Sequence, residues 1–327
     1  MRRSGLSAVI LIFAGVALLL SSGATADDNA RFRYIAPIPK TLPLDARKIA
    51  LGEELFNDHR LSAGDKLACS SCHHLEFGGA DNRARSVTNM GEADILNAPT
   101  VFNSIYNFRQ SWSGAFRTLE EQAEAAIRNP RHGNTDWPVI LPKLKSDIAF
   151  RKRFTDVYDN INRETILDAI ATFEKSLITP NAPFDRYLKG DENAITALAK
   201  KGYSLFKSRG CISCHHGRNV GGNMFQRLGV FGAYEPKHER SSEHQGRFEV
   251  TGAEEDRYVF KVPSLRNVAV TGPYFHDGSV DSLDEAVRIM AYLQLGITLS
   301  DNDVKKIVSF LSSLTGEFRG VSLAQEK

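Results

Sequence analysis

All four cysteines of this 327-residue chain lie in two copies of one pentapeptide pattern, Cys69-Ser-Ser-Cys72-His73 and Cys211-Ile-Ser-Cys214-His215. Two thiols at this spacing reach the two vinyl groups of one porphyrin as thioethers, and the histidine that follows lies beneath the iron. A structural zinc site or a redox dithiol would leave both histidines unexplained. The sequence therefore predicts two covalently bound c-type haems, with His73 and His215 as iron ligands.

The N-terminus has the pattern of an export signal. Two arginines precede an apolar run from Leu6 to Leu20, and small residues then lead to Ala26, where we expect cleavage. The run is short for a membrane span, so an uncleaved anchor is the weaker alternative. Because haem c is attached on the exported side of the membrane, the signal and the haem motifs together predict a periplasmic location.

The charge balance argues against a nucleic-acid-binding class of protein. Removal of the signal takes away Arg2 and Arg3, which leaves 39 acidic side chains and an equal number of basic ones. The sequence has no basic stripe and no cluster of basic and aromatic residues. We expect small molecules or another soluble protein as partners, and a length sufficient for two domains.

The helical patterns indicate a duplicated plan. A helix with the pattern small-Gly-x-x-Leu-Phe precedes each haem motif, over residues 50–56 and 199–206. Capping boxes predict helices from Thr118 through Ile127 and from Ser282 through Met290, and amphipathic spacing predicts helices over 164–177 and 301–314. Strand patterns are scarce. We predict a mainly α fold of two cytochrome c-like haem domains in tandem with long loops, an N-terminal domain over 27–184 and a C-terminal domain over 185–327.

Five further segments occur in a characteristic order: Asn97–Asn103, Thr118–Gln122, Val220–Asn223, Phe260–Asn267 and Pro273–Gly278. From about Pro43 to Gly316 the chain resembles the bacterial dihaem cytochrome c peroxidase family, whose relatives include the MauG enzymes. The resemblance implies that hydrogen peroxide is reduced to water at the first haem. It also implies a small electron-donor protein, a c-type cytochrome or cupredoxin, that reduces the second haem, and homodimers are usual in the family.

The resemblance assigns the remaining ligand of the second haem. It places this ligand in the helix after His276, where the chain has Met290, whereas the MauG enzymes have tyrosine there. A thioether raises the reduction potential of a haem, which suits a haem that receives electrons. Met290 therefore favours the peroxidase branch. The alternative is a methionine that only packs in the core.

The first haem departs from the family pattern. Some members block its iron at rest with a removable histidine shortly before the Asn-Ala-Pro segment, where this chain has Asn89 and Met90. No histidine lies between His74 and His132. We expect an iron that is open to peroxide, with ligation by Met90 as the alternative.

A second departure concerns proton transfer. At the position of the family's catalytic glutamate the chain has His132, preceded by Arg131. An imidazole can take a proton from bound peroxide and return it to the leaving oxygen, and Arg131 can stabilise developing negative charge. His132 could instead bind the iron, which would give a six-coordinate haem that carries electrons and does no chemistry. A surface histidine without a role is the third interpretation.

Two further sites follow from the resemblance alone. Trp112 occupies the place of an aromatic residue that relays electrons between the two haems, with ordinary core packing as the alternative. A calcium ion between the domains is implied at Asn97, Thr271 and Pro273, through one side-chain oxygen, backbone carbonyls and waters.

The function expected from these observations is that of a periplasmic dihaem peroxidase. One alternative is a MauG-like oxidase that modifies a partner protein. The other is an electron carrier or redox sensor with two six-coordinate haems, which carries out no chemistry.

Overall fold

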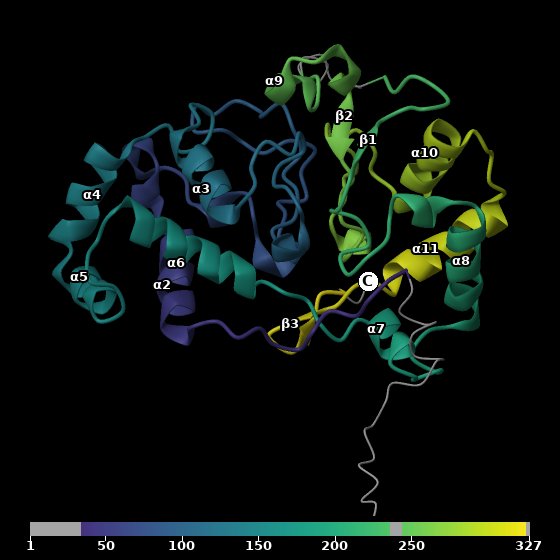
Figure 1. The fold of residues 1–327 in the computed structure, drawn as a ribbon, viewed down its shortest axis with the longest axis horizontal. Coiled ribbons are helices and arrows are strands. Elements are labelled where there is room, and N and C mark those ends of the chain that lie inside the picture. The colour runs from purple at the N-terminus through teal and green to yellow at the C-terminus, as the bar shows by residue number, and fades with distance from the viewer. Residues whose placement is uncertain (1–33, 236–243, 325–327) are drawn as a thin grey trace, which may run out of the picture.

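The computed structural model describes residues 34–235 and 244–324, so the predicted signal peptide lies outside the described residues. The chain forms two helical lobes side by side (Figure 1). None of the helices in these ranges is long and apolar enough to cross a membrane. The first lobe contains α2 (Ala46–Phe56), α3 (Leu119–Arg128), α4 (Trp137–Ser146), α5 (Ile148–Thr155) and α6 (Arg163–Ser176); the second contains α7 (Pro183–Leu188), α8 (Ala197–Ser208), α9 (Phe248–Thr251), α10 (Leu283–Leu295) and α11 (Asp301–Ser312).

The strands are short and form two antiparallel ribbons. β1 (Phe225–Arg227) pairs with β2 (Val259–Lys261), and β3 (Glu317–Phe318) pairs with β4 (Val321–Ser322). Long loops fill much of the space around the helices (Figure 1). This confirms the predicted mainly α class, and the structural relatives described below agree with tandem cytochrome c-like lobes.

The two lobes repeat one helix crossing. In the first lobe α2 packs on α6, and in the second α8 packs on α11. A glycine permits each contact, because a Cβ atom on Gly52 would lie 2.0 Å from the carbonyl oxygen of Ala169, and one on Gly202 would lie 1.9 Å from that of Lys306. The repeated glycine of the sequence pattern is thus explained by backbone-to-backbone packing at equivalent crossings.

We expect Gly202→Ala to destabilise the protein by at least about 1–3 kcal/mol, because the added methyl group overlaps the α11 backbone and must push the helices apart. Denaturant unfolding of the haem-loaded protein measures the change in the free energy of unfolding. Lys201→Ala is the matched control, since Lys201 is exposed on the same helix. Equal stability of the two variants would contradict the close crossing of α8 and α11.

Each lobe has its own apolar core. In the second lobe, the ring of Phe310 lies 4.9 Å from that of Phe184 and 5.1 Å from those of Tyr203 and Phe206. In the first lobe, Leu55 of α2 and Ile166 of α6 belong to one buried cluster that also contains apolar side chains of α4 and α5. Both cores lie beside the helix crossings that flank the haem motifs.

The segments near the two ends of the described chain pack on the opposite lobes. Near the N-terminus, Ile35 is part of the core of the second lobe. Arg266 and Asp185 form a fully buried ion pair of 2.7 Å, and Arg266 also donates to the carbonyl of Ala36. Asp185 in turn accepts from the backbone N–H of Ile38, at 3.2 Å. These contacts fix residues 34–38 on the second lobe.

The C-terminal ribbon makes the reciprocal crossing. Leu323 is buried in a core cluster of the first lobe, and Phe318 packs against the same cluster. The ring of Phe318 lies 5.0 Å from that of Phe102, and Arg319 forms an ion pair with Glu53 of α2. The division of the chain near residue 184 stays a prediction, and both lobes are completed by a distant terminus.

The predicted helix starts agree with the observed caps. The Thr118 hydroxyl accepts from the backbone N–H of Glu121, and the Ser282 hydroxyl accepts from that of Glu285. The Glu121 carboxylate accepts from the N–H of Arg117. The helix that begins after Ser282 continues to Leu295, beyond its predicted extent at Met290.

Candidate functional site: two haem-attachment turns

The first pentapeptide begins with a single 3₁₀ turn. This turn spans Cys69–Ser71, and the backbone N–H of His73 donates to the carbonyl of Cys69 at 3.1 Å. Burial lowers the pKa of His73, so its imidazole is neutral at neutral pH. Its Nδ1 lies 3.2 Å from the carbonyl of Gly79, which makes Nδ1 the protonated nitrogen and leaves the Nε2 lone pair for a metal.

The second pentapeptide repeats this geometry. Its 3₁₀ turn spans Cys211–Ser213, and the N–H of His215 donates to the carbonyl of Cys211 at 3.0 Å. Burial lowers the pKa of His215 to about 4. Gly221 lies against the imidazole, because a Cβ atom there would be 2.2 Å from the carbonyl oxygen of Pro263 and 3.3 Å from His215 Nδ1. The backbone at Gly221 thus packs closely against the imidazole ring of His215.

The side chains of both turns fit haem c. All four cysteines are free thiols, and burial raises the pKa of Cys69 to about 12 and that of Cys211 to about 11. Each turn therefore presents two unpaired thiols next to a buried, neutral imidazole. Thioether formation consumes two thiols per porphyrin, and the imidazole supplies an iron ligand. Cys69, Cys72 and His73 would hold one haem, and Cys211, Cys214 and His215 the other.

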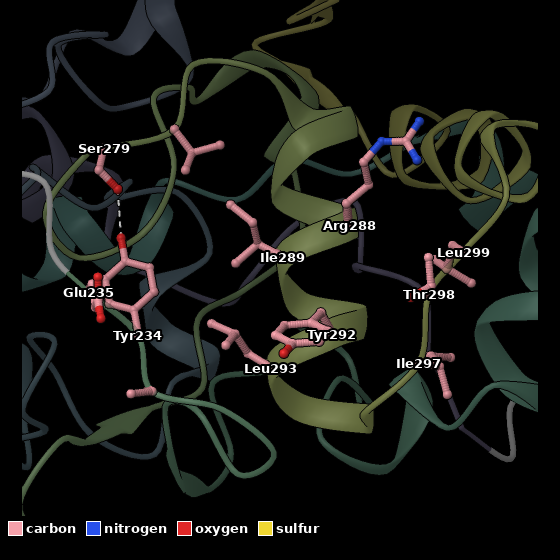
Figure 2. A pocket seen from close by; sticks show the side chains of 12 residues that line it. Tyr234, Glu235, Ser279, Arg288, Ile289, Tyr292, Leu293, Ile297, Thr298 and Leu299 are labelled. Carbon is pink, nitrogen blue, oxygen red and sulfur yellow. Dashed lines mark hydrogen bonds between the residues drawn. The ribbon is translucent and has the colours of Figure 1, made fainter.

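Met290 lies on α10 and is partly buried. The same helix contributes Ile289, Tyr292 and Leu293 to the lining of a pocket of about 450 Å³, and Met290 is not among the lining residues (Figure 2). Its role as an iron ligand stays a prediction.

We expect Met290→His to keep a six-coordinate second haem and to lower its reduction potential, because imidazole favours ferric iron more than a thioether does. Redox titration of both haems measures the effect. Ile289→His is the matched control, since Ile289 is the neighbouring residue and lines the pocket of about 450 Å³. This variant should leave the reduction potential unchanged. Unchanged potentials in the Met290 variant would reduce Met290 to a packing residue.

His132 forms a short contact with a buried carboxylate. Its Nε2 lies 2.8 Å from Asp94 Oδ2. Burial is the largest single effect and raises the pKa of Asp94, but the hydrogen bond and charge of His132, the backbone N–H of Ile95 and the charge of Arg131 together outweigh it. The pKa is therefore lowered, and Asp94 is ionised at neutral pH. A carboxylate can only accept, so Nε2 carries the proton and Nδ1 is the basic nitrogen of the neutral ring. The imidazole is 44% exposed, which leaves it accessible.

The turn that carries His132 is held from both sides. The Asn129 side chain accepts from the N–H of Arg131 at 2.8 Å, and the N–H of His132 donates to the carbonyl of Asn129 at 3.0 Å. Asn89 binds the same turn, because its side chain donates to the carbonyl of Gly133 and its N–H to that of Arg131. Arg131 Nη1 lies 4.0 Å from Asp94 Oδ1.

His132 lies near the first haem turn. The pKa of His73 is lowered mainly by burial, and a positive charge on His132 contributes to the lowering. The Asp94 charge likewise contributes to the raised pKa of Cys72, for which burial is the main cause. Met90, the alternative ligand, is 58% exposed at its turn. At the position where the resemblance places a removable histidine in some family members, the chain has Asn89, a residue that fixes the His132 turn.

Trp112 connects the two lobes. Its indole Nε1 donates to the carbonyl of Asn97 at 2.9 Å, and its own carbonyl accepts from the N–H of Lys261 on β2. Its ring lies 6.4 Å from that of the buried His276. This position between segments of both lobes suits the predicted relay.

The residues predicted to bind calcium, Asn97, Thr271 and Pro273, all lie in the described part of the chain. The Asn97 amide donates to the carbonyl of Arg83 at 2.9 Å, which leaves its oxygen as an acceptor. Thr271 and Pro273 lie in the turn before His276, and the Gly272–Pro273 peptide bond is cis. The described residues contain no group of three or more His, Cys, Asp and Glu side chains arranged for a metal. Calcium, which would use an amide and carbonyls here, stays a prediction.

Sequence reasoning missed two buried ionisable groups near these turns. Glu174 of α6 is buried, which raises its pKa to about 8, and its charge contributes to the raised pKa of Cys69. Lys261 is buried in β2, which lowers its pKa to about 8. In the sequence, a glutamate in a helix or a lysine in a strand looks like an ordinary solvent-exposed side chain. Only the folded structure shows that Glu174 and Lys261 are buried.

The duplicated helical lobes and the two haem-attachment turns define a dihaem c-type cytochrome. A family model described as di-haem cytochrome c peroxidase matches residues 46–193. Over 305 residues, the chain is 45% identical to a cytochrome c peroxidase of Escherichia coli (strain K12), covering 91% of this chain and 64% of that protein. Over 303 residues it is 41% identical to a cytochrome c551 peroxidase of Nitrosomonas europaea, covering 92% of this chain and 88% of the relative.

A solved structure of a MauG-like protein associated with microbial copper homeostasis superposes with a TM-score of 0.73 at 28% identity, covering 86% of this chain and 93% of that one. The chain belongs to the di-haem cytochrome c peroxidase family. Membership implies two haem c groups, in agreement with the two turns. The chain spans 64% of the length of the Escherichia coli relative, which is therefore a longer protein.

Proposed function

We propose that this protein is a periplasmic peroxidase that reduces hydrogen peroxide to water with electrons from a small redox protein. The observation that carries the proposal is the contact between His132 Nε2 and Asp94, which leaves a basic Nδ1 beside the first haem turn. The peroxidase names of the relatives at 45% and 41% identity support it. A haem at the first turn would supply an iron that binds peroxide and exchanges electrons with it.

The side chains of this chain would transfer a proton from one peroxide oxygen to the other. His132 Nδ1 takes a proton from peroxide, and the ring, now doubly protonated, returns it to the oxygen that leaves as water. Asp94 keeps the ring oriented and stabilises its cationic form, because the carboxylate already accepts from Nε2. Arg131 supports the same carboxylate from 4.0 Å and adds positive charge to the site. One peroxide takes up two electrons and two protons and gives two waters.

The electrons would enter at the second turn. With Met290 as the second ligand of that haem, its potential would suit a donor such as a c-type cytochrome or cupredoxin, and Trp112 would relay electrons to the first haem. Trp112 is suited to this because its carbonyl and indole bind segments of different lobes. A calcium ion at Asn97, Thr271 and Pro273 and a homodimeric assembly complete the proposal.

A steady-state assay tests the proposed function. The purified mature protein is mixed with a reduced c-type cytochrome and hydrogen peroxide, and we expect two cytochromes oxidised per peroxide. The ferric protein should show a high-spin component from an open first iron. Two low-spin irons and no peroxide loss would instead identify an electron carrier. Peroxide-dependent oxidation that occurs only on a co-purifying protein would identify a MauG-like oxidase.

A further inference from the structure

A row of aromatic rings leads from Trp112 to a phenol in the second lobe. The Trp112 ring lies 6.4 Å from that of His276, and the His276 ring lies 5.5 Å from that of Tyr234, centroid to centroid. His276 is buried, and its imidazole lies between the other two rings. Imidazole is much harder to oxidise than indole or phenol, so it separates two oxidisable side chains without competing for the charge.

The phenol has a proton acceptor in place. The Tyr234 hydroxyl lies 2.7 Å from Asp277 Oδ1 and 2.6 Å from the Ser279 hydroxyl. Asp277 is completely buried, and its Oδ2 has no hydrogen-bond partner among the described residues. Burial and the carboxylate raise the pKa of Tyr234, so the phenol keeps its proton until it is oxidised. A buried carboxylate with an unused oxygen is ready to take that proton.

Tyr234 also reaches a cavity. It lines the pocket of about 450 Å³ beside α10, and the hydrogen bond between Tyr234 and Ser279 is drawn at its edge (Figure 2). The other lining residues include the apolar Ile289 and Leu293, the charged Glu235 and Arg288, and a second phenol, Tyr292. The row of rings thus begins between the two lobes and ends at a cavity.

We propose that Tyr234 is a redox-active tyrosine that receives an oxidising equivalent from Trp112. The proposal rests on the proposed peroxidase function, since hydrogen peroxide is the oxidant that withdraws an electron from Trp112. Tyr234 gives one electron, through His276, to the oxidised indole, and its phenolic proton passes to Asp277. The O–H bond of Tyr234 breaks, an O–H bond forms on Asp277, Trp112 is restored, and a neutral tyrosyl radical remains at the pocket wall.

This relay would matter when the electron-donor protein is scarce. An oxidising equivalent that remained between the lobes would damage the residues around it. Transfer to Tyr234 moves it to the pocket, where a small phenolic reductant can return an electron. Asp277 then returns the proton to the phenol, so the cycle leaves the protein unchanged.

The test uses the haem-loaded full-length mature protein, fully oxidised and mixed with one equivalent of peroxide in the absence of donor. Electron paramagnetic resonance at low temperature should detect a tyrosyl radical whose hyperfine pattern collapses in protein that contains ring-deuterated tyrosine. Tyr234→Phe should lose this signal. Tyr292→Phe is the matched control, since Tyr292 lines the same pocket outside the row of rings, and it should keep the signal.

Asp277→Asn tests the proton step, and we expect it to slow formation of the radical because the amide cannot accept the phenolic proton. Haem content and peroxide consumption are measured for every variant, so that a folding defect is recognised. Peroxide consumed with a tyrosyl signal unaffected by Tyr234→Phe, or with no tyrosyl signal at all, would overturn the relay and leave the peroxidase proposal standing. No peroxide consumption by the parent protein would overturn both.

Discussion

Replacement of His132 by alanine is expected to slow peroxide reduction by about a hundredfold or more, the usual scale for the loss of a general acid and base. The physical reason is the loss of Nδ1, the basic nitrogen that the Asp94 contact leaves available. Stopped-flow measurement of peroxide consumption checks the rate. The high-spin signal of the ferric protein should remain in the variant, because in the proposed mechanism His132 does not bind the iron, which is open in the parent protein too.

Two further variants sharpen this prediction. His132→Glu introduces the residue that the family resemblance implies at this position and should recover part of the rate. Asp94→Asn keeps the size of the side chain but removes its charge, so the rate should fall while His132 is still present. If His132 binds the iron instead, the parent protein will be low-spin at both haems. The alanine variant will then gain a high-spin signal and react faster with peroxide, the opposite of both expected changes.

The double replacement of Cys69 and Cys72 by serine is expected to leave one covalent haem and to abolish peroxide turnover. Serine cannot form thioethers, so the first turn loses its haem, while Cys211 and Cys214 are untouched. Mass spectrometry of the intact chain counts the remaining haem, and the donor assay measures turnover. The matched control replaces Cys211 and Cys214, which should retain a peroxide-reactive iron but lose oxidation of the donor. Turnover at the parent rate in the first variant would reverse the assigned roles of the two haems.

The features that could be predicted from the sequence are those written within a few residues. The two pentapeptides are local motifs, and the structure shows each with a 3₁₀ turn and the same N–H to carbonyl bond. The caps at Thr118 and Ser282 are local in the same way. Family resemblance added His132, because it implied a catalytic glutamate at that position, and the role of His132 stays a prediction.

The partner of His132 could not be predicted. Asp94 is 38 positions away in sequence, and nothing in its local pattern distinguishes it from an exposed loop carboxylate. The row of rings from Trp112 to Tyr234 likewise depends on contacts between distant segments. Such pairs arise only when the loops are packed, so local periodicity contains no information about them.

Part of the fold was missed for a different reason. Helix α4 was not among the predicted helices, and it contains Pro142 in its interior, where proline normally ends or kinks a helix. Burial of Trp137, Ile140 and Leu144 in the core of the first lobe outweighs the weak helix propensity. Tertiary packing decides the outcome where the local pattern is contradictory.

The crossed chain ends have a consequence for how such proteins can be rearranged in evolution. Because Ile35 completes the second lobe and Leu323 the first, a cut near residue 184 separates each core from one of its own members. A crossover between related genes at that point would join residues 34–38 of one protein to the Arg266–Asp185 pair of another. The pair would then have to bind an N-terminal segment with which it did not evolve. The unit that recombination can exchange intact is therefore a lobe together with the far terminus that packs on it.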